Sequence, residues 1–300
     1  MQSLLNLGEM SQSMLIFGGP YSNLQATIAM QEIALQERIP PENIVCTGDI
    51  VAYCADPEQT TNLIREWGIN VVMGNCEESI GFSSNNCGCG FEEGSVCATL
   101  SVDWYNYCLR EIGTKNQLWM QRLPRRIQFT VNQLSFDVIH GGVSNISEFI
   151  FESSDLAKKY SDISSLSTHC IIGGHSGIPF GQTVRDRYWL NAGVIGMPAN
   201  DGQQNGWYMR LEPTGDGAIA SWHTLNFDNA SAAASMKTMG LPSEYQTSLI
   251  NGLWPSLSVL PDLEAGRQGM TLHPEPLKIQ RNWSPGLQPN ASDTAHFPLR

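Results

Sequence analysis

Four short apolar runs in this chain each lead to a glycine that neighbours a residue able to bind a metal ion. The four dipeptides are Gly48-Asp49, Gly74-Asn75, His140-Gly141 and Gly174-His175. Helix-like stretches separate the first runs, which predicts strands that alternate with helices and a sheet that is at least partly parallel. In open α/β sheets the carboxyl ends of the strands form the ligand crevice. The pattern therefore predicts one site built from Asp49, Asn75, His140 and His175.

The donor atoms of this predicted site indicate what it would bind. One carboxylate, one amide oxygen and two imidazoles suit a borderline divalent ion such as Zn, Mn, Fe or Co. Taken singly, each residue also has a structural interpretation, because an Asp after a strand often caps a helix and a lone His is often a satisfied core residue. The four together favour a metal site.

The spacing of apolar and polar residues gives a coarse division of the chain. Residues 1–13 form a leading segment, 14–230 one α/β domain with an insertion at 80–126, and 231–300 an extension rich in Pro, Gly, Ser and Asn. Helices are expected over 23–38 and 56–67, and in the extension over 242–253 and 261–266. Further strand-like runs lie close together, which predicts antiparallel pairing in a second sheet; they are 127–131, 134–139, 170–172, 188–190 and 207–211.

Composition excludes several classes of protein. Hydrophobic residues make up 41% of the 300 residues and charged residues 15%, which is enough apolar material for a substantial core. The net charge of 17 − 29 = −12 argues against nucleic acid and against an anionic membrane surface as partners. No apolar run approaches the roughly 20 residues of a membrane-spanning helix. With no export signal at the start, the eight cysteines are expected to be mostly thiols in the cytoplasm.

The ordered motifs resemble those of the calcineurin-like metallophosphoesterases, most closely the small bacterial phosphodiesterase-like branch. The resemblance rests on residues 48–51, 74–77, 140–141 and 174–175, and on 191–198, which is similar to a strand near the end of that domain. It spans about residues 14–230. It implies a four-layer α/β/β/α sandwich, here with a Cys-rich cap insertion and a Pro-rich extension. It also implies a hydrolase that acts on a small phosphate ester or diester.

Two motifs of the family are broken in this chain. The Asp and His of the first motif correspond to Gly19 and Tyr21, and the second His of the last motif corresponds to Gly177. The resemblance assigns these lost residues to one metal and Asp49, Asn75, His140 and His175 to the other, which implies one ion per chain. It also predicts that restoring the three lost ligands would raise the metal content toward two. The alternatives are a metal-free fold, and a non-catalytic member that acts through a partner protein.

Other residues near these motifs have predicted roles in catalysis or substrate binding. In the loop 18–22, glycine amides and the hydroxyls of Tyr21 and Ser22, followed by the matching Asn23, predict an anion-binding cradle; a tight turn with a packed Tyr is the alternative. Cys76 stands where many relatives carry a proton-donating His, which makes it a weak general acid. Glu77 is expected to orient Cys76 or a ligand, or to cap a helix.

Two features lie outside the domain motifs. Cys87, Cys89 and Cys97 fall within a Gly-rich stretch, where a redox disulfide or buried thiols are favoured over a soft-metal site. In the extension, Trp254-Pro255 either packs back on the domain or docks a partner. The cap and the extension are thus the expected contacts for a partner protein or a second copy of the chain.

Overall fold

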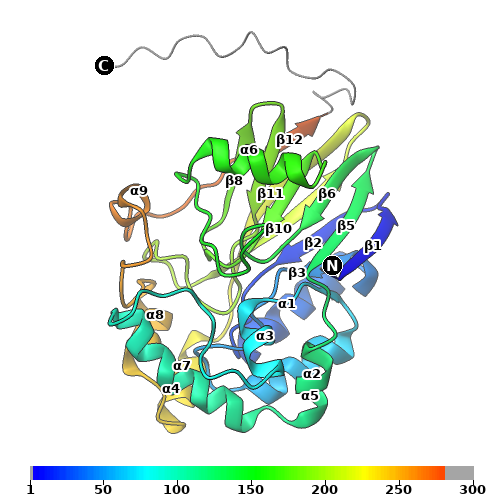
Figure 1. Ribbon diagram of the computed structural model, residues 1–300. Helices are drawn as coiled ribbons and strands as arrows, with labels where there is room; N and C mark the ends of the chain where they lie inside the picture. Colours follow the sequence, from blue (N-terminus) through cyan, green and yellow to red (C-terminus); the bar gives the residue numbers. More distant parts are fainter. Residues whose placement is uncertain (1–2, 281–300) are drawn as a thin grey trace, which may run out of the picture.

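The computed structural model describes residues 3–280, and the strands of this part form two sheets (Figure 1). The first sheet has the strand order β12-β11-β10-β2-β3-β4. Its members are β2 (Met14–Phe17), β3 (Ile44–Cys46), β4 (Asn70–Val71), β10 (Gly206–Pro213), β11 (Gly217–Leu225) and β12 (Leu277–Gln280). β2, β3 and β4 are parallel, and β10, β11 and β12 extend the sheet in antiparallel fashion from β2.

The second sheet has the order β1-β5-β6-β7-β9-β8. Its members are β1 (Leu4–Glu9), β5 (Arg126–Val131), β6 (Leu134–Val138), β7 (Cys170–Gly173), β8 (Phe180–Val184) and β9 (Arg187–Asn191). β1, from the expected leading segment, pairs in parallel with β5. Of the predicted runs in this sheet, only β5 and β6 pair in antiparallel fashion, since β6, β7 and β9 are parallel. β8, which was not predicted, pairs with β9 in antiparallel fashion. The run at 207–211 joins the first sheet instead, as part of β10.

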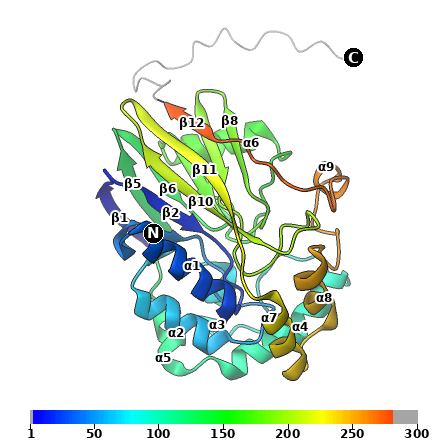
Figure 2. The same ribbon diagram turned by 180° about the vertical axis from the view of Figure 1, so that it is seen from behind.

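Helices cover the outer faces of both sheets and complete a four-layer α/β/β/α sandwich. On the first sheet lie α1 (Leu24–Glu37), α2 (Pro57–Trp67) and α7 (Asn229–Thr238), seen in front in Figure 2. On the second sheet lies α6 (Leu156–Ser165), which contacts β8 and β9. Because α6 is the crossover between β6 and β7, these two strands run parallel.

The alternation of side chains along β2 shows how the layers are held together. Met14 and Ile16 are buried between the two sheets. Leu15 and Phe17 are buried on the other face, among side chains of the helical layer. Successive residues of a strand point to opposite faces, so a strand buried on both faces is apolar throughout. The short runs of the sequence are therefore the central strands of the sandwich.

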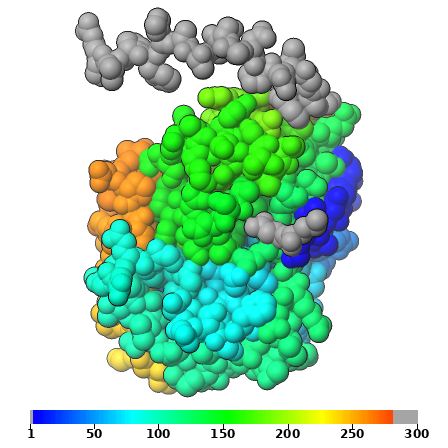
Figure 3. Space-filling model, viewed as in Figure 1, coloured from blue at the N-terminus to red at the C-terminus, as the bar shows by residue number. Residues whose placement is uncertain are grey.

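The insertion is helical and covers one end of the sandwich. It follows α3 (Asn75–Gly81) and contains α4 (Val96–Glu111) and α5 (Thr114–Met120). In Figure 3 the cyan segment, which includes the Gly- and Cys-rich loop, lies against the green segment around residues 140–165. The extension contains α8 (Ser243–Asn251) and α9 (Asp262–Ala265). The remainder of the expected tail, residues 281–300, lies outside the described residues. No helix among residues 3–280 has the length and apolar character needed to cross a membrane.

Candidate metal centre

The four side chains predicted from the strand ends meet in one place. Asp49 follows β3, Asn75 begins α3 soon after β4, His140 follows β6 and His175 follows β7. The Nε2 atom of His140 lies 3.0 Å from Asn75 Oδ1 and 3.1 Å from His175 Nδ1. It is also 3.3 Å from Asp49 Oδ2, which lies 3.9 Å from His175 Nδ1. All four residues are buried.

Two hydrogen bonds fix which atoms face the centre. The carbonyl oxygen of Thr47 lies 2.7 Å from His140 Nδ1 and can only accept, so Nδ1 carries the hydrogen and Nε2 presents its lone pair. The amide nitrogen of Asn75 donates to the carbonyl of Cys87 at 3.0 Å, which leaves Oδ1 facing His140. A carboxylate, an amide oxygen and an imidazole nitrogen therefore direct lone pairs at the same space.

The separations between these atoms suit one divalent cation. Metal bonds of roughly 2.1 Å in a tetrahedral arrangement place the ligand atoms about 3.4 Å apart. The separations quoted above run from 3.0 to 3.9 Å. One group of three acidic, Cys or His side chains in the described part of the chain has its ligand atoms within 4.8 Å of one another. It consists of Asp49, His140 and His175. The residues present therefore fit a metal ion.

The charges at the centre also favour a cation. Burial disfavours the charged form of Asp49, but the charges and hydrogen bonds of the two histidines outweigh burial and hold the pKa of Asp49 below its usual range. Burial alone would lower the pKa of His140. The charge and hydrogen bond of the Asp49 carboxylate act in the opposite direction, so the pKa of His140 is raised overall. For His175 burial prevails and the pKa is lowered. Asp49 thus stays negatively charged at the centre.

Glu77 holds the loop that carries Asp49. Its carboxylate accepts the backbone N–H groups of Asp49 at 2.8 Å, Ile50 at 2.7 Å and Gly74 at 2.9 Å. Asp49 has a φ of +58°, a conformation that a non-glycine residue keeps only when its surroundings impose it. Burial, and then the charge of Asp49, raises the pKa of Glu77 to about 7. Glu77 is therefore a positioning residue, and its bond to Gly74 also caps the first turn of α3.

Gly74 is required at its position by this close packing. A Cβ atom on Gly74 would lie 2.5 Å from Asp49 Oδ1 and 2.7 Å from a Glu77 carboxylate oxygen. Both are shorter than real Cβ contacts, so a side chain here would displace the Asp49 carboxylate. The glycine that precedes Asn75 in the sequence motif is thus explained by the approach of the Asp49 loop.

Cys76, for which a role as a weak general acid is predicted, lies buried beside Asp49. Its backbone N–H donates to Asp49 Oδ1 at 3.2 Å. The thiol is buried in the core between the first sheet and its helices. Burial, and then Asp49, raises the pKa of Cys76 well above its usual range. A thiol with so high a pKa is a weaker acid than an ordinary cysteine.

The loop at residues 18–23 does not form the expected anion cradle. Every N–H group of the loop donates to a backbone carbonyl, and Pro20 has none to offer. The donors and acceptors are Gly18 to Gly193, Gly19 to Gly48, Tyr21 to Asp49, Ser22 to Ile50 and Asn23 to Pro20. These bonds fasten the loop to the Asp49 loop and leave no amide for a ligand.

Ser22 and Asn23, which were expected to bind substrate, have structural partners. The Ser22 hydroxyl accepts the N–H of Ala52 at 3.1 Å. The Asn23 side chain caps α1 by accepting the N–H of Ala26 at 3.0 Å, and it donates to the carbonyl of Gly196 at 2.9 Å. Both side chains are fully buried. Of the three predicted residues, Tyr21 is the one whose ring lines a cavity beside His175.

The loop between α3 and α4 forms a roof over the centre, which the motifs did not reveal. The Asn75 amide that donates to Cys87 also lies 3.4 Å from Cys89 Sγ. The Ser147 hydroxyl donates to the carbonyl of Gly88 and ties the roof to the second sheet's loops. The ring of Phe149 lies 4.2 Å from the ring of His175. These contacts explain why the four candidate ligands are buried.

The cysteines of the roof pair with each other rather than gather around a metal. Cys87 and Cys89 form a disulfide. Cys97 is a buried free thiol at the start of α4, where the Ser258 hydroxyl lies 3.8 Å from its sulfur. The three cysteines therefore do not act as one ligand set, and the disulfide interpretation holds for two of them.

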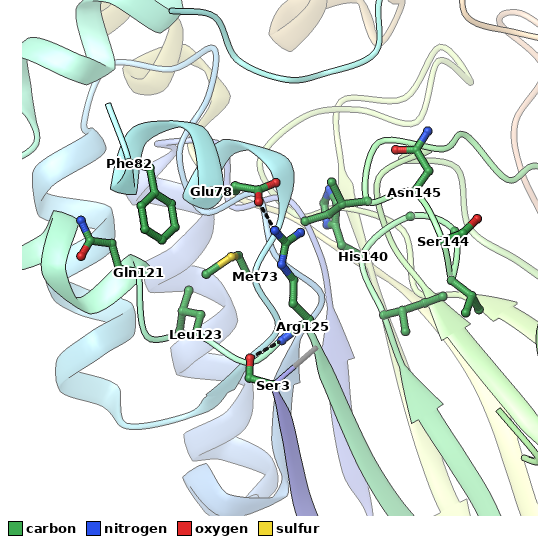
Figure 4. A pocket seen from close by; sticks show the side chains of 15 residues that line it. Ser3, Met73, Glu78, Phe82, Gln121, Leu123, Arg125, His140, Ser144 and Asn145 are labelled. Atoms are coloured by element: carbon green, nitrogen blue, oxygen red, sulfur yellow. Dashed lines mark hydrogen bonds and ion pairs between the residues drawn. The ribbon is translucent and has the colours of Figure 1, made fainter. Parts of the chain in front are cut away.

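A cavity of about 720 Å³ lies beside His140 (Figure 4). The loop at 141–145 forms one side of the cavity. Arg125 and Glu78 lie on the other side and form an ion pair. His140 is thus shared by the buried centre and a space large enough for a phosphorylated ligand.

Residues 23–215 match the family model described as the calcineurin-like phosphoesterase superfamily domain. The chain belongs to this superfamily. The family that the sequence motifs indicated is therefore confirmed, and the four-layer sandwich is the fold that the resemblance implied.

Two solved structures share the fold of this calcineurin-like phosphoesterase. A metallophosphoesterase from Sphaerobacter thermophilus is similar with a TM-score of 0.61 and 21% identity, over 81% of this chain and 100% of that chain. A hypothetical protein from Pyrococcus horikoshii OT3 is similar with a TM-score of 0.67 and 13% identity, over 81% of this chain and 99% of that chain. At these identities the likeness concerns the fold alone. No curated protein matches the chain significantly.

Proposed function

We propose that this protein is a metal-dependent hydrolase of a small phosphate ester or diester that works with one ion. The ion is held by Asp49 Oδ2, Asn75 Oδ1, His140 Nε2 and His175 Nδ1. The observation that carries the proposal is the convergence of acceptor atoms on one space. Thr47 and Cys87 fix the His140 ring and the Asn75 amide so that, with a neutral imidazole, acceptor atoms face one another across a space that suits a cation.

The residues of the chain prepare the site in three ways. A divalent ion, when bound, supplies Lewis acidity toward the phosphate and lowers the pKa of water. Asp49 stays charged because its pKa is held low, and Glu77 keeps it in place through three N–H bonds. The roof of Cys87, Cys89 and Phe149 limits the access of bulk water. Low water content strengthens the interaction of these charges with a substrate phosphate.

The larger cavity is the proposed approach for the phosphate. His140 and Arg125 both line it. The ion pair with Glu78 fixes this guanidinium at the cavity wall. A cationic guanidinium is suited to a planar, multidentate contact with phosphate oxygens. No described group near the centre is placed to protonate the leaving group, so substrates with good leaving groups are favoured.

A second candidate function is a non-catalytic one, in which a bound metal or ligand serves a partner protein. It is favoured by the burial of the ligands, of which His175 is the most exposed at 9%. The cap helices and the extension would then provide the contact with the partner or with a second copy. We also place the protein in the cytoplasm as part of the proposal, because six of its eight cysteines are free thiols.

The experiment that separates these functions is a hydrolysis assay with a metal titration. Bis(p-nitrophenyl) phosphate and p-nitrophenyl phosphate are given to the metal-free chain with increasing Mn²⁺, Zn²⁺, Fe²⁺ or Co²⁺. Turnover that saturates at one equivalent of metal and is lost in Asp49→Asn supports the hydrolase. Metal binding without turnover of either ester supports the non-catalytic function. Turnover that persists in Asp49→Asn contradicts the assigned site.

A further inference from the structure

The roof over the metal centre carries a disulfide whose two cysteines are separated by a single residue. Cys87 and Cys89 are bonded across Gly88, while the other six cysteines of the chain are free thiols. A disulfide stabilises a fold most when it closes a long loop, so a bond between residues two apart contributes least in this way. In a protein whose other cysteines remain thiols, such a bond is typical of a reversible redox pair.

The disulfide lies directly against one of the candidate metal ligands. The amide nitrogen of Asn75 donates to the carbonyl of Cys87 at 3.0 Å and lies 3.4 Å from Cys89 Sγ. These contacts leave Asn75 Oδ1 facing His140. The backbone N–H of Cys89 in turn donates to Cys87 Sγ at 3.3 Å. The turn that the disulfide closes therefore also orients a ligand of the metal centre.

The same turn fastens the roof to the loops of the second sheet. The carbonyl of Gly88 accepts a hydrogen bond from the Ser147 hydroxyl. Just beyond the turn, the ring of Phe91 lies 6.3 Å from the ring of Phe149, and the two are stacked. The roof segment at 82–95 contains no helix or strand, so no backbone ladder of its own holds its shape. We therefore expect the closed position of the roof to depend on the shape of this turn.

The disulfide is placed where a small reductant can reach it. Cys87 and Cys89 are 5% and 4% exposed, whereas Cys46 and Cys170 in the strands are 0% exposed. The residues at 82–86 directly before the pair are exposed. A local opening of this loop would expose both sulfur atoms while every helix and strand stays folded.

We propose that the Cys87–Cys89 disulfide is a redox-reversible latch, which holds the roof over the metal centre until a dithiol reduces it. The inference rests on the metal centre of the proposed function and not on the hydrolysis step. The reduced turn no longer fixes the carbonyl that holds the Asn75 amide. The roof then opens, and the metal ion and other ligands exchange with solvent.

The reduction is a thiol–disulfide exchange with a dithiol. A thiolate of the reductant attacks Cys89 Sγ, the bond between the two cysteine sulfurs breaks, and Cys87 leaves as a thiolate that takes up a proton. The second thiol of the reductant then attacks the mixed disulfide and releases Cys89. Two electrons and two protons pass to the protein, and the dithiol becomes a disulfide. The reverse exchange, with a disulfide as the oxidant, closes the latch again.

The test measures how fast full-length, Mn²⁺-loaded protein loses its metal to excess EDTA. One sample stays oxidised, and the other is reduced with dithiothreitol and desalted without oxygen. Partners that orient metal ligands typically change metal affinity about 10–100-fold, so reduction should speed metal loss at least about tenfold. The double variant Cys87→Ser, Cys89→Ser should lose metal fast without reductant. Cys97→Ser, which removes a free thiol of the same insertion, is the matched control and should respond as wild type does.

The outcomes separate the latch from the metal centre. Equal rates in oxidised and reduced wild type overturn the latch, and so does slow metal loss from a folded double variant. The wild-type comparison needs no variant, so misfolding of the double variant does not affect it.

Hydrogen–deuterium exchange of the metal-free protein gives a second readout. Reduction should speed exchange at 82–95 and 145–149 and leave β6 unchanged. Faster exchange there in a chain that binds no metal would support the latch and overturn the metal centre. Tight metal binding with unchanged metal loss and unchanged exchange would support the metal centre and overturn the latch.

Discussion

The ring of Trp254 occupies the space in which a side chain on Gly177 would have to lie. A Cβ atom on Gly177 would be 3.3 Å from Trp254 Cζ2, and Gly177 has a φ of +70°. Gly19 is enclosed in a similar way: its Cβ would lie 2.5 Å from the Tyr21 ring and 2.6 Å from Val194. Neighbouring side chains therefore crowd Gly19 and Gly177, two of the three positions that match lost metal ligands of the family.

This packing reverses the expectation that lost ligands can be restored. In the triple variant Gly19→Asp, Tyr21→His, Gly177→His, Val194 and Trp254 still block two of the new side chains. Positive φ at Gly19 and Gly177 adds strain of about 1 kcal/mol or more at each position. We expect a lower melting temperature and no second metal ion, measured by calorimetry and elemental analysis.

Gly8→His is the matched control for this variant. Gly8 has a φ of +75° and nothing within 4 Å of its Cβ position, so it carries the strain without the obstruction. Gly177→His should destabilise the protein more than Gly8→His does. A folded triple variant with two ions per chain would show that Val194 and Trp254 can move to admit the ligands.

The three backbone bonds of Glu77 predict a strong effect on metal affinity. Glu77→Ala leaves the N–H groups of Asp49, Ile50 and Gly74 without their acceptor, and buried unpaired donors cost about 1–3 kcal/mol each. Residues that orient metal ligands typically change affinity by roughly 10–100-fold. We expect a loss of metal affinity in this range, measured by competition with a chelating dye, together with a lower stability in urea.

Glu66→Ala provides the comparison for Glu77→Ala, because the Glu66 side chain is 70% exposed. It should change neither metal affinity nor stability appreciably. If Glu77→Ala kept the wild-type metal affinity, the Asp49 loop would have to be held by other contacts.

The disulfide predicts a specific count of thiols. In the denatured, unreduced protein six thiols should react with Ellman's reagent, and after reduction eight should react. In the native protein none should react quickly, because all six free cysteines are buried. Reduction of the native protein should then release Cys87 and Cys89 first. Eight reactive thiols before reduction would contradict the Cys87–Cys89 bond.

Lys159 predicts a pH dependence of stability that does not involve the metal. Its ammonium donates to the carbonyl of Glu152 at 2.9 Å and to Gln182 Oε1 at 2.6 Å, and burial lowers its pKa from 10.5 to about 8. Between pH 8 and 10.5 the unfolded chain therefore holds a proton that the folded chain has released. Stability gains from this group as pH rises through that window.

Buried thiols with a raised pKa make the protein less stable as pH rises, which opposes the effect of Lys159. The contribution of Lys159 is therefore obtained by comparing wild type with a variant that lacks this lysine. The free energy of unfolding in urea is measured at pH 7.5 and pH 9.5 for wild type and Lys159→Met. The change with pH should be more positive in wild type than in Lys159→Met. Equal changes in the two proteins would mean that Lys159 titrates normally in the fold.

The sequence predicted the centre because its residues are local to strand ends. Asp49, Asn75, His140 and His175 each lie beside a glycine at the end of a short apolar run, and parallel strands bring such ends together. The helix expected over 56–67 also matches α2 closely, since Asp56-Pro57 marks its start. Strand ends and helix starts of this kind can be predicted because they depend only on residues adjacent in the sequence.

Features that depend on distant partners could not be predicted in the same way. The amides of the loop at 18–23 looked free for an anion, but all except one of their acceptors come from two distant segments, residues 48–50 and Gly193. Trp254 lies in a Pro-rich stretch with no pattern that places it beside Gly177. The pairing of β1 with β5 was not predicted either, because Asn6, Gly8 and Glu9 interrupt its leucines and the strand is largely exposed.

The central claim is one metal ion per chain, held by the four residues at the strand ends. The most direct measurement is equilibrium dialysis of the metal-free protein against Mn²⁺, followed by elemental analysis of wild type, His140→Ala and the exposed-residue control Glu66→Ala. The account predicts one ion per chain in wild type and in Glu66→Ala, and almost none in His140→Ala. Two ions per wild-type chain, or equal metal content in His140→Ala, would contradict it.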